Sequence, residues 1–269
     1  MAHTGARPDR PTPPVPTAPG PAVDGRALVS LLAVIAAVLV VASVAFAGLD
    51  DAVPGNSIGA RLVHALHRFT FTDREGNLWS WFSVLSLALL AVVFAGHAFV
   101  QRRTGGKPLP YAALGLVALY LSLDEDVSLH EKLAGLVPEH RSTFQWLVYG
   151  LPVALVAGLV VLWLARRIDR SLRRRLIVAG VVYLLGAAVT ESIEAVVVLA
   201  QPSRTEALAS FWYALSAGVE EGLEVAGVLL AIRAALLALQ VRIAPAEATS
   251  GASAPAAPDV SPSTGAQTR

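Results

Sequence analysis

The sequence contains no cysteine, so it offers no disulfide, no thiolate metal ligand and no cysteine nucleophile. Charge is also scarce: Asp, Glu, Lys and Arg make up 15% of the 269 residues, and the formal net charge is +1. This balance lacks the basic excess that nucleic-acid-binding proteins show, so we expect no nucleic-acid partner. A glycine-rich phosphate loop, a G-x-S-x-G elbow and an HExxH motif are also missing, which removes the common signatures of nucleotide binding, serine hydrolysis and zinc peptidases.

The chain is rich in apolar residues. Hydrophobic residues make up 55% of the chain, and the mean hydropathy is +0.59. A helix of about 20 apolar residues crosses the hydrocarbon core of a bilayer. Most of the apolar runs lack the polar stripes of a soluble helical bundle. The sequence therefore predicts an all-α, polytopic membrane protein with six spans in residues 26–242, at roughly 27–48, 79–101, 110–133, 144–165, 176–200 and 208–232.

Both ends of the chain differ in composition from this apolar region. Residues 1–25 and 243–269 are rich in proline and alanine and carry no periodic apolar face, so we expect disordered tails. An alternative concerns the first span, because Ala45-Phe46-Ala47 matches the A-x-A pattern of signal-peptidase sites. Cleavage there would leave five spans. The long apolar run and the long tail before it favour an uncleaved first span.

The distribution of basic residues predicts the orientation. Arg and Lys number 14 in the first tail, the 102–109 and 166–175 loops and the segment after the sixth span, against six in the opposite loops. The positive-inside rule then places both termini in the cytoplasm. Arginine supplies 19 of the 21 basic residues, and alanine and valine are abundant, which is typical of a GC-rich bacterial genome. We therefore expect a multi-pass protein of a bacterial cytoplasmic membrane.

Residues 57–72 are expected to form a short helix lying in the membrane interface, with Leu62 and Phe69 on its apolar side and Arg61 and Arg68 on another. Within it, His64 and His67 are three residues apart and could bind a metal, but two interfacial histidines are the favoured interpretation. His97 lies near the inner end of the second span, shortly before two arginines, so it is also expected in the interface.

The aromatic residues Trp79, Trp81 and Phe82 at the start of the second span are expected at the headgroup level.

Acidic residues inside apolar runs are the main functional signal. A charged side chain at the centre of a membrane helix costs a few kcal/mol even on the most lenient scales, so such residues indicate function. The third, fifth and sixth predicted spans contain nine acids between them. We expect the ligands or proton carriers to be Asp124, Glu131, Glu191, Glu194, Glu220 and Glu224, followed by Glu125, His130 and Glu221.

Helical spacing supports a shared site for these acids. At 100° per residue, Asp124 and Glu131 share one face, whereas Asp126 and His130 pair on the other face. The acids of the fifth span share a face, and those of the sixth span lie within one arc. Asp124, Glu191 and Glu220 are each roughly 13 Å from the outer end of their spans, which is close to the bilayer midplane. The acids are therefore expected to form a column that is accessible from outside.

Several carboxylates in a low dielectric cannot all stay ionised without compensation, so they hold protons or bind cations. Oxygen ligands favour Mg²⁺, Ca²⁺ or Mn²⁺, and a nearby histidine also admits Fe²⁺ or Zn²⁺. The leading hypothesis is divalent-metal or proton-coupled cation handling or transport. The first alternative is an intramembrane metal-dependent enzyme, a lipid hydrolase or an oxidase. The second is a non-catalytic scaffold or sensor. A structural alternative places residues 124–126 in a hydrated loop that follows a short third helix.

Overall fold

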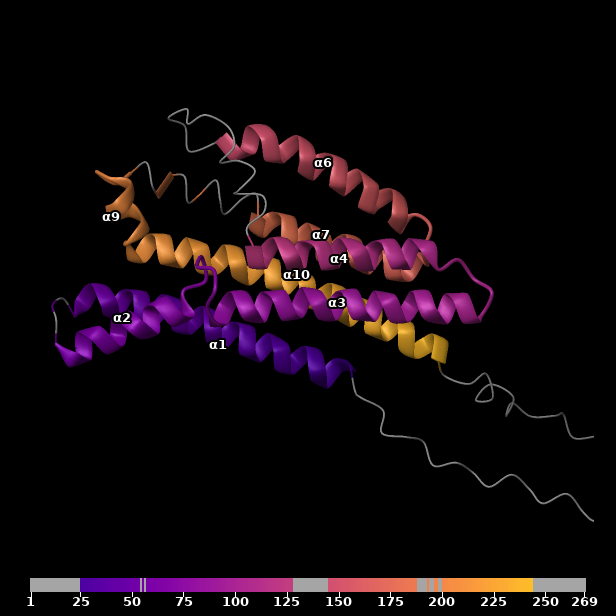
Figure 1. Ribbon diagram of the computed structural model, residues 1–269, viewed down its shortest axis with the longest axis horizontal. Helices are drawn as coiled ribbons and strands as arrows, with labels where there is room; N and C mark the ends of the chain where they lie inside the picture. Colours follow the sequence, from indigo (N-terminus) through magenta and orange to yellow (C-terminus); the bar gives the residue numbers. More distant parts are fainter. Residues whose placement is uncertain are drawn as a thin grey trace, which may run out of the picture.

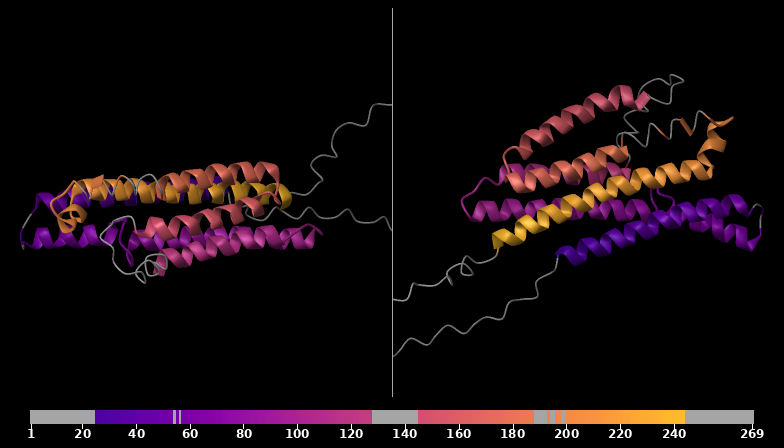
Figure 2. Two further views of the ribbon diagram at one scale, coloured as in Figure 1. Left: turned by 90° about the horizontal axis from the view of Figure 1, so that it is seen from above. Right: turned by 180° about the vertical axis from the view of Figure 1, so that it is seen from behind.

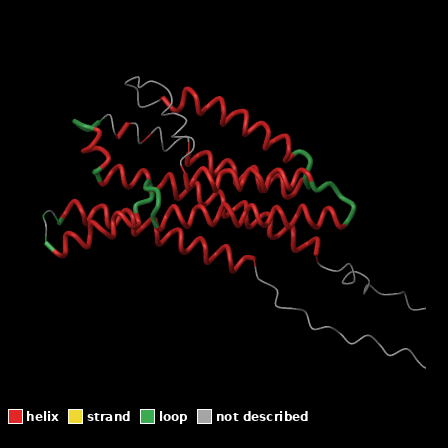
Figure 3. Tube along the Cα trace, in the orientation of Figure 1, coloured by secondary structure: helices red, strands yellow, loops and turns green. Residues whose placement is uncertain are grey.

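The computed structural model describes residues 25–53, 55, 57–127, 145–187, 193, 196–197 and 200–243. All regular structure in these residues is helical (Figure 3). The helices are α1 (Gly25–Ala52), α2 (Ile58–Thr70), α3 (Leu78–Arg103), α4 (Leu109–Val127), α6 (Gln145–Ala165), α7 (Arg170–Leu185), α9 (Arg204–Leu208) and α10 (Phe211–Ile243). The prediction of an all-α fold is confirmed for this part of the chain.

The long helices run lengthwise beside one another (Figure 1). Two layers are visible when the views are compared: α3 packs against α4, α7 packs against α10, and α10 also contacts α3 and α1 (Figure 2). Helix α6 lies on the outside against α4. The start of α1 and the end of α10 lie at one end of the bundle, and α2 and α9 lie at the other end (Figure 1).

Close contacts through glycine hold each pair of helices together. A Cβ atom on Gly227 of α10 would lie 2.8 Å from the Ala179 carbonyl oxygen and 2.8 Å from the Tyr183 Cβ of α7. Gly115 of α4 similarly leaves only 3.2 Å between such an atom and the Ala91 carbonyl oxygen of α3. Small residues let two helix backbones approach closely, which is how helices pack when lipid removes the hydrophobic difference between the interface and its surroundings.

Three helices, α1, α3 and α10 over Phe211–Leu239, are long and apolar enough to cross a membrane, by length and composition and counting only the described residues. Helix α4 has 19 residues but carries Asp124, Glu125 and Asp126 near its end. Helix α7 has 16 residues and begins with the arginine-rich stretch RSLRRR. These charges and lengths separate α4 and α7 from the three apolar helices, so the prediction of six spans remains a prediction.

The structure corrects several predicted boundaries. Helix α10 continues to Ile243, so the exposed Arg233 lies inside the helix and not beyond the last span at residue 232. An arginine on a helix surface keeps its stem on apolar atoms and its head in a polar layer, so it does not have to end the helix. The loop alternative for residues 124–126 is wrong, because α4 runs through them to Val127. The predicted tails and residues 128–133 lie outside the described residues, apart from Gly25 and Ile243 at the helix ends.

The short helix expected within residues 57–72 is confirmed as α2. Its first turn is capped by Ser57, whose Oγ accepts the Ala60 backbone N–H at 3.1 Å. Helix α2 folds back against the end of α1 and buries Ala60 and Thr70. At its far end the Thr72 N–H donates to the buried Ser43 Oγ of α1 at 3.2 Å, which fixes where the chain turns toward α3.

Candidate functional site

Acidic side chains from α4 and α10 lie close enough for their charges to act on one another, and each of them is half-buried. Glu125 comes from α4, and Glu221 and Glu224 come from α10. The largest charge effects on Glu221 come from Glu125 and Glu224, and Glu220 adds a smaller one. The Tyr183 hydroxyl of α7 hydrogen-bonds the Glu224 carboxyl, and the charges of Glu125 and Glu221 also act on it. We call Glu125, Tyr183, Glu221 and Glu224 the carboxyl cluster.

Trp79 adds a hydrogen-bond donor from a fourth helix. The Trp79 side chain is fully buried, and its Nε1–H donates to the Glu221 Oε2 at 2.9 Å. Its position follows from the start of α3, where the Asn77 Oδ1 accepts the backbone N–H groups of Trp79 at 2.9 Å and of Ser80 at 3.1 Å. The Ser80 Oγ in turn accepts the Asn77 backbone N–H, which completes a capping box. This cap fixes the first turn of α3 and points the indole at α10.

Two glycine contacts place Tyr183 against α10. Gly227 lets the α7 backbone approach α10 beside Tyr183, and a Cβ on Gly186 would lie 2.8 Å from the Glu220 carbonyl oxygen and 3.0 Å from the Glu224 Cγ. Tyr183 therefore lies on the α7 face that meets the acids of α10. The cluster depends on this close packing, because a wider helix separation would move the hydroxyl away from Glu224.

Helix α4 is held to α3 one turn before its acids. The Ser122 Oγ–H donates to the Val84 carbonyl oxygen at 2.9 Å, and Ser122 itself is buried. This bond fixes the rotation of α4, so that Glu125, three residues later, shares its environment with Tyr183 and Glu221. Asp124 is half-buried beside it, whereas Asp126 is exposed.

The predicted site residues therefore fall into three groups. The structure brings Glu125, Glu221 and Glu224 together, with Glu220 at the edge of the group. Asp124 lies on the same turn of α4 as Glu125. The remaining residues, His130, Glu131, Glu191 and Glu194, lie outside the described residues. No group of three His, Asp or Glu side chains within the described ranges is arranged to hold a metal, so a divalent metal remains a prediction for the complete acid set.

Sequence reasoning missed two of the polar side chains at the carboxyl cluster, Trp79 and Tyr183. Trp79 was expected at the headgroup level but is buried, whereas Trp81 is 63% exposed. Trp79, Phe82, Ser86 and Leu90 repeat at helical spacing along one buried face of α3, and this stripe was the available signal. Tyr183 had no such signal, because its role depends on the glycine contacts of α7.

The interfacial position expected for His97 is wrong. His97 lies on the buried face of α3 and is 0% exposed. Its Nε2 lies 2.8 Å from the Ala235 carbonyl oxygen of α10, and its ring stacks on Tyr111 of α4 with centroids 5.2 Å apart. This histidine ties three helices together at the end of the bundle opposite to α2 (Figure 1).

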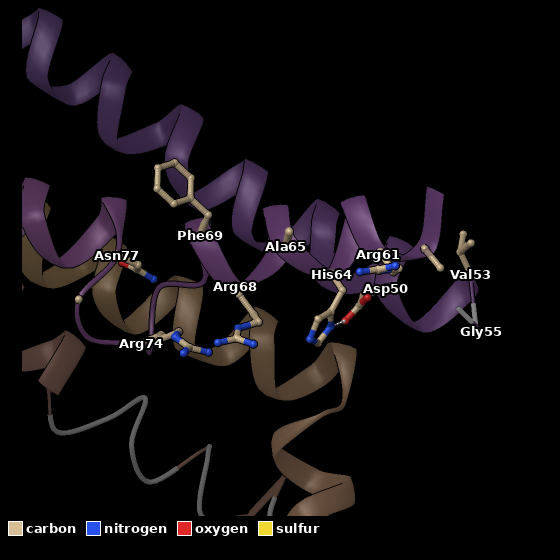
Figure 4. A pocket seen from close by; sticks show the side chains of 12 residues that line it. Asp50, Val53, Gly55, Arg61, His64, Ala65, Arg68, Phe69, Arg74 and Asn77 are labelled. Carbon is tan, nitrogen blue, oxygen red and sulfur yellow. Dashed lines mark hydrogen bonds and ion pairs between the residues drawn. The ribbon is translucent and has the colours of Figure 1, made fainter. Parts of the chain in front are cut away.

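A second polar site lies at the end of the bundle that carries α2. The Asp50 Oδ2 lies 3.0 Å from the His64 Nδ1 and 3.2 Å from the His67 Nδ1. A cavity of about 720 Å³ opens beside Asp50 and His64, and its basic lining residues are Arg61, His64, Arg68 and Arg74. Figure 4 shows the Arg68 and Arg74 side chains pointing toward one another and His64 pointing toward Asp50. We call this cavity the arginine pocket. Both histidines thus contact the same carboxylate oxygen of Asp50.

These features define a class: an all-helical protein with three helices long and apolar enough to cross a membrane, an interior carboxyl cluster and a basic pocket at one end. The chain belongs to the domain-of-unknown-function family DUF8692, whose model matches residues 31–239. This range includes the residues of the carboxyl cluster and of the arginine pocket. No curated protein and no solved structure matches the chain.

Proposed function

We propose that the protein is a multi-pass protein of a bacterial cytoplasmic membrane that handles cations, protons or divalent metal ions, at its carboxyl cluster. In this proposal the chain crosses the membrane six times with both termini in the cytoplasm, and α4, α6 and α7 join the three apolar helices as spans. The excess of arginine in the 102–109 and 166–175 loops supports this orientation.

The observation that carries the proposal is the meeting of Glu125, Glu221 and Glu224. The charged groups that act most strongly on Glu221 are all carboxyl groups. Like charges at close range are strongly unfavourable in a low dielectric, where the Coulomb energy is many times larger than in water. The cluster must therefore take up protons or a cation to stay folded, and either response couples its state to the ion concentration outside.

Two hydrogen-bond donors give the cluster a defined shape for this task. The Trp79 indole N–H satisfies one oxygen of Glu221, and the Tyr183 hydroxyl hydrogen-bonds Glu224. The Trp79 bond thus orients the Glu221 carboxyl, and the Tyr183 bond ties Glu224 of α10 to α7. Asp124 and Glu220 flank the cluster, and Glu131, Glu191 and Glu194 complete the proposed set of acids.

Glu221→Gln tests the proposal because glutamine keeps the shape and an oxygen acceptor for Trp79 but removes the charge. Wild type is expected to lose thermal stability at alkaline pH in the presence of chelator, as the carboxyl groups ionise together. The variant should lose less, because one repelling charge is gone. If the ligand is a divalent ion, the ion should stabilise wild type by roughly 2.7 kcal/mol at a hundredfold excess over Kd, and the variant should lose this gain.

The matched control is Glu206→Gln, which changes an exposed acid in α9, outside the cluster. The control should melt like wild type at every pH, with and without chelator. The measurement is the melting temperature of the full chain in detergent from neutral to alkaline pH, with chelator or with each of Mg²⁺, Ca²⁺, Mn²⁺, Fe²⁺ and Zn²⁺. A response to pH without a response to metal identifies protons as the ligand. Equal behaviour of E221Q and wild type in all conditions contradicts the proposal.

A further inference from the structure

We propose that the arginine pocket binds the phosphate of an anionic phospholipid, whose acyl chains lie along the exposed apolar side of α2. The pocket lies at the α2 end of the bundle and shares no residue with the carboxyl cluster. This inference therefore does not depend on the cation-handling proposal.

The first observation is an excess of positive over negative side chains in the lining of the cavity. Arg61, Arg68 and Arg74 line the cavity, and no ion pair joins any of them to another described residue. Asp50 is the one acidic residue in the lining of this cavity, and it already accepts from His64 and His67. The pocket therefore keeps its positive charge and is complementary to an anion.

The second observation is how these arginines are arranged. Arg68 comes from α2 and Arg74 from the turn before α3, and their guanidinium groups point toward one another (Figure 4). Two facing cations repel unless an anion lies between them. A guanidinium donates two parallel N–H bonds to a phosphate, so a phosphate group suits this geometry well.

The third observation distinguishes a lipid from a free anion. On α2, Ile58, Leu62 and Phe69 are 87%, 59% and 54% exposed, and they lie on one strip of the helix beside the strip of Arg61 and Arg68. An apolar strip that adjoins a basic strip matches the boundary between acyl chains and headgroups. At the same end, Trp212 at the start of α10 is 64% exposed, as expected for an aromatic residue at the headgroup level.

The test uses the full chain purified in non-ionic detergent and follows its melting temperature during three titrations. The probes are short-chain phosphatidylglycerol, phosphatidylcholine of the same chain length, and inorganic phosphate. Phosphatidylglycerol should raise the melting temperature of wild type in a saturable way, and the other two probes should do so only at concentrations at least tenfold higher. The double variant Arg68→Gln with Arg74→Gln loses the charge-assisted bonds to the phosphate, so it should bind phosphatidylglycerol about a hundredfold more weakly.

Two further variants keep the test specific. The control pair Arg174→Gln and Arg175→Gln removes two exposed arginines of α7, far from the pocket, and should leave the phosphatidylglycerol affinity within about twofold. Ile58→Gln with Leu62→Gln should weaken phosphatidylglycerol binding but leave phosphate binding unchanged, because neither residue lines the pocket and both lie on the apolar strip. Without lipid, all variants should melt close to wild type, since the changed residues are exposed.

Three results would overturn the proposal. Equal affinity for inorganic phosphate and phosphatidylglycerol would identify a free-anion site. Equal affinity for the two phospholipids would show that the arginines do not select for charge. Equal losses in the pocket pair and the α7 control pair would show that any arginine pair attracts the lipid, with no site in the pocket.

Discussion

The carboxyl cluster and the arginine pocket both collect charges of one sign, but in opposite surroundings. Glu221 accepts from a fully buried indole in the interior, whereas Arg61, Arg68 and Arg74 are exposed at one end of the bundle. Two like charges 4 Å apart interact by only about 1 kcal/mol in water, but by several times more at the lower effective dielectric of a protein. In our proposal the half-buried acids therefore take up a proton or a cation, whereas the exposed arginines tolerate an empty pocket.

The two regions are also held in different ways. The cluster depends on helix backbones in contact at Gly186 and Gly227, and on the cap that positions Trp79. The arginine pocket depends on the short helix α2, which folds against α1, and on the contacts of Asp50 with two histidines. One of these, His64, has a side chain that is 59% exposed. We therefore expect substitutions around the cluster to cost more than substitutions around the pocket, and the following variants rank this difference.

The largest loss is expected from Gly227→Ala. The added methyl would lie 2.8 Å from the Ala179 carbonyl oxygen and from the Tyr183 backbone nitrogen, so α7 has to move. Overpacking of this kind costs about 1–3 kcal/mol, and here it also separates Tyr183 from Glu224. Thermal unfolding of the purified chain measures the loss.

Gly180→Ala is the matched control, because a Cβ at Gly180 of α7 meets nothing within 4 Å. Alanine has the higher helix propensity, so this variant should be neutral or more stable by up to about 1 kcal/mol. The opposite signs of the two glycine variants distinguish a close helix contact from a general effect on α7 or α10. Similar losses in both would contradict the packing described for this pair of helices.

An intermediate loss is expected from Trp79→Phe, which keeps an aromatic ring in place but removes the N–H that donates to Glu221. The half-buried Glu221 carboxyl then lacks this donor, which should cost about 1–3 kcal/mol. The matched control is Trp81→Phe on the same helix, where the side chain is 63% exposed and the change should be close to neutral. If the two variants melt together, Trp79 contributes packing alone and the bond to Glu221 has no energetic role.

The sequence predicted the positions of α1 and α3 well because an apolar run is a local signal. An apolar run of about 20 residues indicates a membrane helix wherever it packs, and α1 and α3 extend only one to four residues beyond the predicted runs at any end. Glu221 and Glu224 were recognised because charge is costly among apolar neighbours.

The residues that sequence reasoning missed depend on contacts between helices. Trp79 near the start of α3 and His97 near its end have the composition of interfacial residues, and only their partners on α10, Glu221 and Ala235, show that they are buried. Tyr183 joins the cluster only because Gly227 allows α7 to approach. The predicted end of the last helix was too early, because the apolar run stops at Arg233 whereas the helix continues beyond it.

The smallest effect is expected from Asp50→Asn at the arginine pocket. The variant keeps one oxygen acceptor for His64 at 3.0 Å or His67 at 3.2 Å but removes the negative charge. The side chains of Asp50 and His64 are 25% and 59% exposed, so water screens the interaction and the loss should stay below about 1 kcal/mol. High salt should reduce it further, because exposed charges are screened within about 3 Å at 1 M ionic strength. Asp51→Asn, at the exposed neighbouring position, should be neutral. Unfolding of these variants and of W79F at low and high salt completes the comparison, since the loss in W79F arises from a hydrogen bond of a fully buried indole and should respond less to salt. A loss in D50N that exceeds the loss in W79F, or that persists unchanged in high salt, would show that the pocket end is as tightly built as the cluster.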